Sequence, residues 1–215
     1  MKKSRFCVAI LLVLVWSFVC VAGVTNNQQE RYSISFGSTM RDFTSSIHMS
    51  SSPLYGIYID AFDNGRKRGN ITDIFDVMGV GLEISGAEQK MNDYIVLSGD
   101  NKWVAFNQLS TLSILLRART YFDKQYITKS SAMMGFDMRL LYFDNAATNS
   151  GLSGVDLGVN IGYYYALGRN GFIEPKIGMN YTSLYKGKLA GDTRVLTSMF
   201  SGSDVNFSVN AGYYF

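Results

Sequence analysis

The sequence predicts an all-β protein, namely a closed, antiparallel, up-and-down transmembrane β-barrel, most simply of eight strands. Three observations support this fold class: an N-terminal export signal, long runs of alternating apolar and polar residues, and a composition poor in charge. Of the 215 residues, 47% are hydrophobic and 17% are charged, whereas soluble globular proteins have about 25% charged residues. This composition excludes a disordered tail protein, a coiled coil and a histone-like DNA-binding protein.

Residues 1–22 have the three parts of a secretory signal peptide. The segment begins with the basic residues Lys2, Lys3 and Arg5. An apolar run follows over residues 6–19, and the segment ends with the small residues Cys20 and Ala22. The apolar run is shorter than the roughly 20 residues that a membrane-spanning helix needs. We therefore expect cleavage after Ala22 and a single barrel domain over residues 23–215. The alternative, a lipid attached to Cys20, is disfavoured by Phe18, which stands where lipoprotein signals usually have a small residue.

Removal of this segment would also set the charge and thiol content of the mature chain. Losing Lys2, Lys3 and Arg5 from the 20 Lys and Arg residues leaves 17 cations against 17 Asp and Glu, so we expect no nucleic-acid partner. Both cysteines, Cys7 and Cys20, would be lost as well, which removes disulfides, thiolate metal sites and cysteine nucleophiles. No later segment has 18 consecutive apolar residues, so we expect no transmembrane helix.

The rest of the chain alternates with a period of two, which is typical of β-strands and not of helices. The alternation holds over residues 155–166 and 204–215. Typical strands have about 5–6 residues, and tilted membrane-spanning strands need about 9–11. Eight strands are expected near residues 31–37, 54–61, 76–86, 110–122, 132–143, 154–166, 171–184 and 203–215. Residues 91–106 could form a short hairpin, within a surface loop or as extra strands, so ten strands is the alternative count. A soluble periplasmic sandwich is a further alternative.

The lengths of the connections predict the orientation of the barrel. With both termini on the periplasmic side, the outward connections are long and polar: residues 38–53, 86–109, 144–153 and 185–202. Two periplasmic connections, residues 123–131 and 167–170, are shorter. The third, residues 62–75, is long for a periplasmic turn.

Aromatic residues on the apolar faces fall near the expected strand ends, where a membrane barrel has its interfacial girdles. At the periplasmic ends these are Tyr32, Phe122, Tyr163, Tyr165, Tyr213 and Phe215, and at the outer ends they are Tyr142 and Tyr181. If aromatic residues were scattered only because strands favour them, they would not lie at matching depths in different strands. We therefore expect these rings to mark the two membrane interfaces.

The opposite faces carry charges that would point into the lumen: Arg117, Arg119, Asp137, Arg139, Asp156, Glu174 and Lys176. An eight-stranded barrel has room only for side chains inside. An unpaired charge there is costly, so these residues should pair across strands. The sequence therefore predicts a lumen plugged by salt bridges, with a narrow porin-like channel as the alternative.

The terminal strand, VNFSVNAGYYF, places aromatic or apolar residues at alternate positions up to the last one: Phe207, Val209, Tyr213 and Phe215. With this strand and its overall pattern, the mature chain resembles small bacterial outer-membrane β-barrel proteins of the OmpA/OmpX type. The resemblance implies location in the bacterial outer membrane and recognition of this strand by the barrel-assembly machinery. The chain departs from the family's pattern at Asn210, where a glycine is usual.

The residues predict no catalytic, cofactor-binding or metal-binding site. The resemblance leaves a lipid-modifying enzyme as an alternative, because such enzymes exist on small barrels and use a His with a Ser and an acidic residue. The only histidine, His48, lies near Ser45, Ser46, Ser50 and Asp42 in the first outward loop, without a matching motif. We expect a non-enzymatic protein whose loops have a structural, adhesion or interaction role. The expected partners are outer-membrane lipid, the assembly machinery and an unidentified extracellular ligand.

Overall fold

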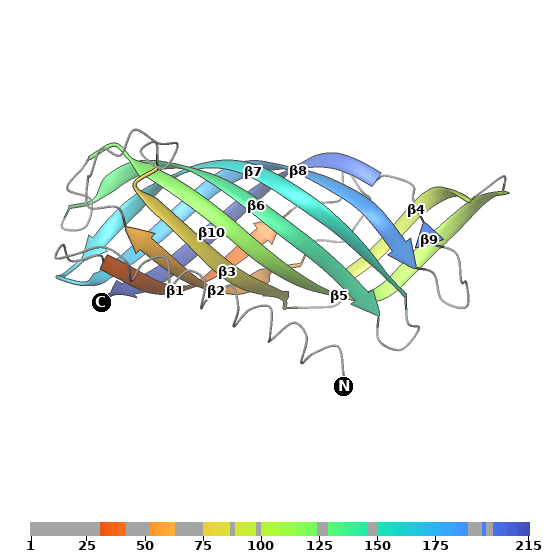
Figure 1. Ribbon diagram of the computed structural model, residues 1–215, viewed down its shortest axis with the longest axis horizontal. Coiled ribbons are helices and arrows are strands. Elements are labelled where there is room, and N and C mark those ends of the chain that lie inside the picture. Colours follow the sequence, from red (N-terminus) through yellow and green to blue (C-terminus); the bar gives the residue numbers. More distant parts are fainter. Residues whose placement is uncertain are drawn as a thin grey trace, which may run out of the picture.

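The computed structural model describes residues 31–41, 52–62, 75–86, 89–97, 100–123, 129–145, 150–188, 195–196 and 200–215. The signal peptide predicted over residues 1–22 lies outside them. Within these ranges the regular structure is all β-strand (Figure 1), and no helix there could cross a membrane. The strands are β1 (Arg31–Arg41), β2 (Leu54–Phe62), β3 (Val77–Ser85), β4 (Gln89–Leu97), β5 (Asp100–Tyr121), β6 (Ser131–Asn145), β7 (Ser150–Leu167), β8 (Gly171–Lys188), β9 (Val195–Leu196) and β10 (Phe200–Tyr214).

Eight of the described strands close into a barrel in which every neighbour is antiparallel. The wall runs β1-β2-β3-β5-β6-β7-β8-β10, and β10 closes it by pairing with β1 from Ser33↔Tyr214 to Arg41↔Asn206. The prediction of eight strands is confirmed. The ten-strand alternative is wrong, because β4 pairs with β5 and β9 pairs with β8 without either entering the wall.

The two ends of the barrel differ in how the strands are connected. At one end, which we call the turn end, β7 and β8 are joined by residues 168–170, where Gly168 has φ 66°. This left-handed conformation favours glycine, and the turn lies where the sequence predicted one. β1 begins and β10 ends at the turn end (Figure 1). The opposite end, the loop end, is the outward side predicted from connection lengths.

A long hairpin extends the barrel beyond the loop end. β5 has 22 residues; its second half pairs with β3 and β6, and its first half pairs with β4. Figure 1 shows this β4–β5 hairpin projecting past the wall. The hairpin suggested for residues 91–106 is therefore present, as part of the outward connection.

The strands reach further toward the loop end than expected. β6 ends at Asn145 and β7 begins at Ser150, and their ladder includes Asp144↔Gly151. The bounds predicted for this outward loop, residues 144–153, are therefore wrong, because residues 144–145 and 150–153 belong to strands. Likewise β8 continues beyond Tyr181 to Lys188, so this ring lies within its strand and not at its outer end. Alternation predicts strands only where one face meets lipid, whereas ladder hydrogen bonds continue above that level.

The exterior of the barrel is apolar and the interior is charged. Exposed and buried side chains alternate along the wall, and the exposed set includes Phe36, Ile57, Val159, Ile161 and Met179. A closed barrel pairs its backbone groups between strands, so this apolar surface suits lipid and not water. The soluble sandwich alternative is therefore wrong.

The residues predicted for the girdles lie on this exterior. Those that are exposed are Phe122, Tyr142, Tyr163, Tyr165, Tyr181, Tyr213 and Phe215. Tyr32 is partly exposed and stacks on Phe215 with ring centroids 6.3 Å apart. The exterior of β10 also carries the predicted assembly-signal residues Phe207 and Val209.

Candidate functional site

The lumen is the strongest candidate site in the described part of the chain. Eleven charged side chains there are at most 4% exposed. Five are basic and six are acidic: Arg41, Arg117, Arg119, Arg139 and Lys176, then Asp60, Glu83, Asp137, Asp156, Glu174 and Asp204. The alternation of the strands brings all seven residues predicted for the lumen to its interior.

Glycines on neighbouring strands make room for these side chains. Gly79 lies between Asp60 on β2 and Arg117 on β5 in the ladder, and a Cβ at Gly79 would collide with the Asp60 carboxylate. Gly158 lies in the same way between Asp137 and Asn180, whose amide a Cβ would meet. The narrow lumen holds large polar groups because the adjacent position has no side chain.

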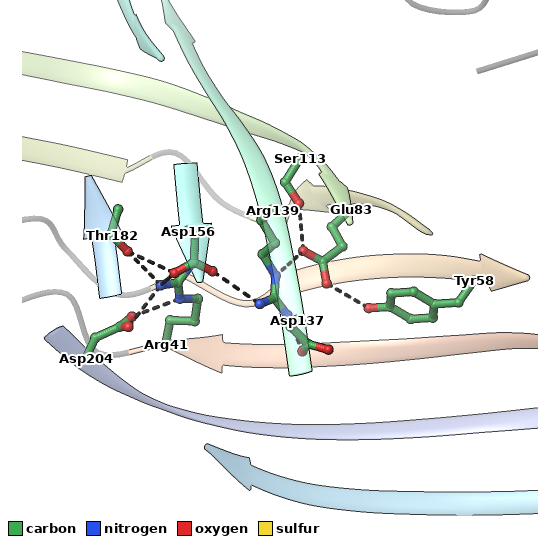
Figure 2. Close-up of polar contacts among 9 residues, drawn as sticks. All are labelled: Arg41, Tyr58, Glu83, Ser113, Asp137, Arg139, Asp156, Thr182 and Asp204. Atoms are coloured by element: carbon green, nitrogen blue, oxygen red, sulfur yellow. Dashed lines mark hydrogen bonds and ion pairs between the residues drawn. The ribbon is translucent and has the colours of Figure 1, made fainter. Parts of the chain in front are cut away.

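Near the loop end, Arg41 of β1 reaches across the lumen to two carboxylates (Figure 2). It donates to Asp156 from Nη1 at 3.1 Å and Nη2 at 3.0 Å, and to Asp204 from Nε at 2.8 Å and Nη2 at 2.9 Å. Thr182 accepts a further bond from Nη2 at 3.0 Å. Such forked pairs combine charge with fixed geometry.

Arg139 continues this network toward β3 (Figure 2). Its guanidinium donates to Glu83 at 2.9 Å, to Asp156 at 3.2 Å and to Asp137 at 3.2 Å. Glu83 also accepts hydrogen bonds from the Ser113 hydroxyl at 2.6 Å and the Tyr58 hydroxyl at 3.0 Å. Because Asp156 is shared by two arginines, these residues form one connected group, which we call the outer cluster.

A second group, the inner cluster, lies nearer the turn end. Asp60 accepts from Arg117 Nε at 2.7 Å and Nη2 at 2.5 Å, and forms an ion pair with Arg119 at 2.7 Å. Arg119 also pairs with Glu174, which accepts from the Tyr121 hydroxyl at 2.9 Å. Asp60 is therefore shared by two arginines, as Asp156 is in the outer cluster.

Tyr58 connects the two clusters. Its hydroxyl donates to Glu83 of the outer cluster, and its ring lies under the Arg117 guanidinium of the inner cluster, with 4.1 Å from Cζ to the ring centroid. A cation over an aromatic face is attracted by the electron-rich ring, and more strongly where water is absent. The polar contacts therefore continue from one end of the charged lumen to the other.

Apolar side chains lie on both sides of the charged region. Toward the turn end, one buried cluster packs together, with ring centroids of Phe62 and Tyr214 4.8 Å apart. Its members are Phe62, Val77, Tyr121, Met133, Tyr164, Phe172 and Tyr214. Toward the loop end, the lumen-facing positions carry Leu54, Leu109, Leu141, Phe143, Leu152 and Leu184, all at most 4% exposed. We call these sets the turn-end layer and the loop-end layer.

Six of the seven predicted lumen residues enter ion pairs, and Lys176 is the exception. It is 4% exposed but makes no ion pair with another residue of the described ranges. The prediction that all seven charges pair with one another is therefore too simple.

Sequence reasoning missed four residues of the network: Arg41, Asp60, Glu83 and Asp204. The alternation could have revealed each of them, because all four lie at the alternate positions of their strands whose side chains face inward. Arg41 lay beyond the expected end of its strand at residue 37, and Asp60 near the end of its own.

The alternative catalytic site around His48 lies outside the described residues, as do Ser45, Ser46, Ser50 and Asp42. Within those ranges, no group of three or more His, Cys, Asp or Glu side chains could hold a metal ion.

Comparison with known proteins identifies the fold. No protein-family model matches the sequence, and no curated protein matches it. Among solved structures, the outer membrane protein OprG of Pseudomonas aeruginosa is similar, with a TM-score of 0.51 at 12% identity, covering 88% of this chain and 98% of that chain. Neisserial surface protein A gives a TM-score of 0.39 at 16% identity, covering 87% and 98%. Ail of Yersinia pestis, the attachment invasion locus protein, gives 0.37 at 14% identity, covering 87% and 100%.

The likeness to OprG shows the fold, and the apolar exterior gives the environment of the wall. The resemblance to small outer-membrane barrel proteins is confirmed at the level of the fold. The chain is a membrane-spanning barrel of the bacterial outer-membrane type, closed by eight strands in its described part.

Proposed function

We propose that this protein is a non-enzymatic outer-membrane barrel whose lumen is a permanent plug and whose outward segments act at the cell surface. One observation carries the proposal: a connected ion-pair network fills the lumen between two apolar layers. This arrangement suits a rigid support for surface segments better than it suits a transport path.

The plug would be expensive to open. A solute crossing the lumen must pass the turn-end layer, both clusters and the loop-end layer. Breaking a buried ion pair by removing one partner costs about 3–5 kcal/mol, and Asp60 and Asp156 each hold two arginines. Displacing either carboxylate therefore removes one partner from each of two buried arginines.

The surface role rests on the loop end. There the β4–β5 hairpin extends past the wall (Figure 1), and the outward connections from β1 to β2 and from β8 to β10 are long and polar in sequence. We propose an extracellular ligand for these segments, membrane lipid around the wall, and the assembly machinery on β10 during biogenesis. We propose no nucleic-acid partner and no cofactor.

A narrow channel is the second candidate, because some lumen groups lack hydrogen bonds. Asp137 Oδ1, Asn160 Oδ1 and Asn210 Oδ1 are buried and have no hydrogen-bond partner among the described residues, and such groups normally bind water. The discriminating experiment is conductance of the purified wild-type barrel in planar bilayers. The plug predicts no steady single-channel currents, and large steady currents would overturn it.

A lipid-modifying enzyme makes a separate prediction. If His48 were catalytic, His48→Ala would abolish a change in outer-membrane lipid composition caused by the wild-type protein. We expect lipid composition to be the same in cells with the wild type, with His48→Ala and without the protein. A change seen only with the wild type would contradict the non-enzymatic proposal.

A further inference from the structure

The exterior wall of the barrel contains a groove of about 510 Å³ near the turn end. This volume is within the range of about 300–1,000 Å³ typical of ligand sites. Its lining comes from β6, β7, β8 and β10 together with Phe122, which follows β5. Ordinary barrel exteriors are covered by side chains at every second residue, so a hollow of this size needs a local cause.

Small and ring-constrained residues make the hollow. Ala132 of β6 pairs with Tyr163 of β7, and Gly162 and Pro175 also line the groove. The β7–β8 ladder runs to Gly162↔Lys176 and resumes at Tyr165↔Ile173, with no pairs between them. Pro175 falls in this interruption, and proline has no N–H for a ladder hydrogen bond. At this point the wall therefore has small side chains on its exterior and an interrupted hydrogen-bond ladder between β7 and β8.

The sides of the groove belong to the lipid-facing surface. Ile161, Ile177 and Phe207 are neighbours in register across β7, β8 and β10, and each is more than half exposed. Two rings, Phe122 and Tyr163, stand at the end of the groove nearer the turn end. The Tyr163 ring also packs on Tyr165, with centroids 4.6 Å apart.

These rings place the groove at a membrane interface. Tyrosine favours the level of the headgroups, where its ring meets acyl chains and its hydroxyl meets polar groups. From this rim the groove runs between apolar side chains toward the middle of the wall. A lipid whose headgroup lies beside Tyr163 and Tyr165 has its acyl chain at the height of Ile161 and Ile177.

We propose that the groove holds one acyl chain of a phospholipid from the periplasmic leaflet, as a bound lipid distinct from the mobile lipid around the barrel. The occupant follows from continuity, because the groove opens onto the lipid-facing exterior and its lining residues are apolar apart from Lys176, whose side chain is buried toward the lumen. A filled groove gives these side chains the close contacts that an empty one lacks. The inference goes beyond the surface role proposed above and does not depend on it.

Filling the groove tests the proposal. The full-length protein is extracted from the outer membrane in mild detergent, and retained phospholipid is measured by native mass spectrometry and by lipid extraction. We expect about one phospholipid per wild-type barrel, and at least a fivefold loss in Ala132→Phe, because the new ring occupies the groove. Met134→Phe is the matched control. It places the same ring on the exterior of the same strand, at a position outside the groove lining, and should retain lipid.

Heat-modified gel mobility shows whether each variant folds. If Ala132→Phe fails to fold, Ala132→Leu fills part of the groove and should give an intermediate loss. Equal retention in wild type, Ala132→Phe and Met134→Phe would mean unspecific surrounding lipid and overturn the proposal. The wild type could instead have the mass of two barrels without lipid, with this species absent in Ala132→Phe. That result would overturn the proposal and show that the groove is a contact between two copies.

Discussion

Asp156→Asn should be among the most destabilising single substitutions in the lumen. The carboxylate accepts two hydrogen bonds from Arg41 at 3.1 and 3.0 Å, one from Arg139 at 3.2 Å and one from Thr182 at 3.2 Å. Asparagine has nearly the same shape, but it removes the negative charge and turns an amide donor toward guanidinium donors. Two buried arginines then share fewer carboxylates, although each keeps another partner in Asp204 or Glu83.

The expected cost follows from the two ion pairs that Asp156 makes with Arg41 and Arg139. Breaking a buried ion pair by removing one partner costs about 3–5 kcal/mol. With a urea slope of about 2 kcal/mol per molar, within the usual range for small proteins, the unfolding midpoint should fall by about 2 M. The assay is urea unfolding of the barrel in lipid vesicles, followed by the gel-mobility difference between folded and unfolded forms.

Asn160→Ala is the matched control on the same strand. Asn160 faces the lumen at 4% exposure, but its Oδ1 has no hydrogen-bond partner in the part of the chain that the structure describes. Its replacement should cost no more than about 1 kcal/mol, in the range of one ordinary hydrogen bond. If Asp156→Asn shifts the midpoint no further than Asn160→Ala, the connected network does not stabilise the barrel and the plug loses its physical basis.

Three further predictions test other parts of the argument. Deleting Phe215 should lower the amount of barrel in the outer membrane more than it lowers the stability of refolded barrel, since burying one ring contributes only about 1.5–3 kcal/mol; normal membrane levels would contradict the assembly role. Gly79→Val should destabilise the barrel by at least the 1–3 kcal/mol typical of overpacking, because the new Cβ collides with Asp60, whereas a urea midpoint equal to wild type would show that the lumen can yield. Proteolysis of intact cells should cut within residues 38–53, 86–109 or 185–202 but spare 144–153, where β6 and β7 are only four residues apart; cleavage confined to the turn end, detected by mass spectrometry, would invert the orientation.

Much of the wall could be predicted because lipid imposes a simple rule on sequence. Each strand must alternate apolar and small or polar residues where it crosses the hydrocarbon, and β7, β8 and β10 do so with few breaks. The alternation therefore predicted directly which side chains of these strands face the lumen, Asp156 and Glu174 among them. The rule fails above the membrane, which is why the extensions of β6 and β7 were expected to be a loop.

β1 shows why part of the charged lumen was missed. Gly37, Ser38 and Thr39 interrupt its apolar alternation, so the strand was expected to end before Arg41. In the structure Gly37 adjoins the Asn210 side chain, and a Cβ there would collide with the Asn210 amide. The small residue is thus a packing requirement of the lumen, whereas from sequence it resembles the start of a loop.

The alternation of side chains along a strand does not predict which residues form ion pairs, because the choice of partners depends on closure of the whole barrel. Arg41 on β1 pairs with Asp156 on β7, residues 115 positions apart, and the wall path between them runs through β10 and β8. The alternation predicts that both side chains point inward, but it does not predict their heights along the barrel axis. That height is set by strand tilt and stagger, which belong to all eight strands together. Lys176 illustrates the same limit: its inward direction was predictable, but only the closed barrel shows that the carboxylates around it are engaged by arginines instead.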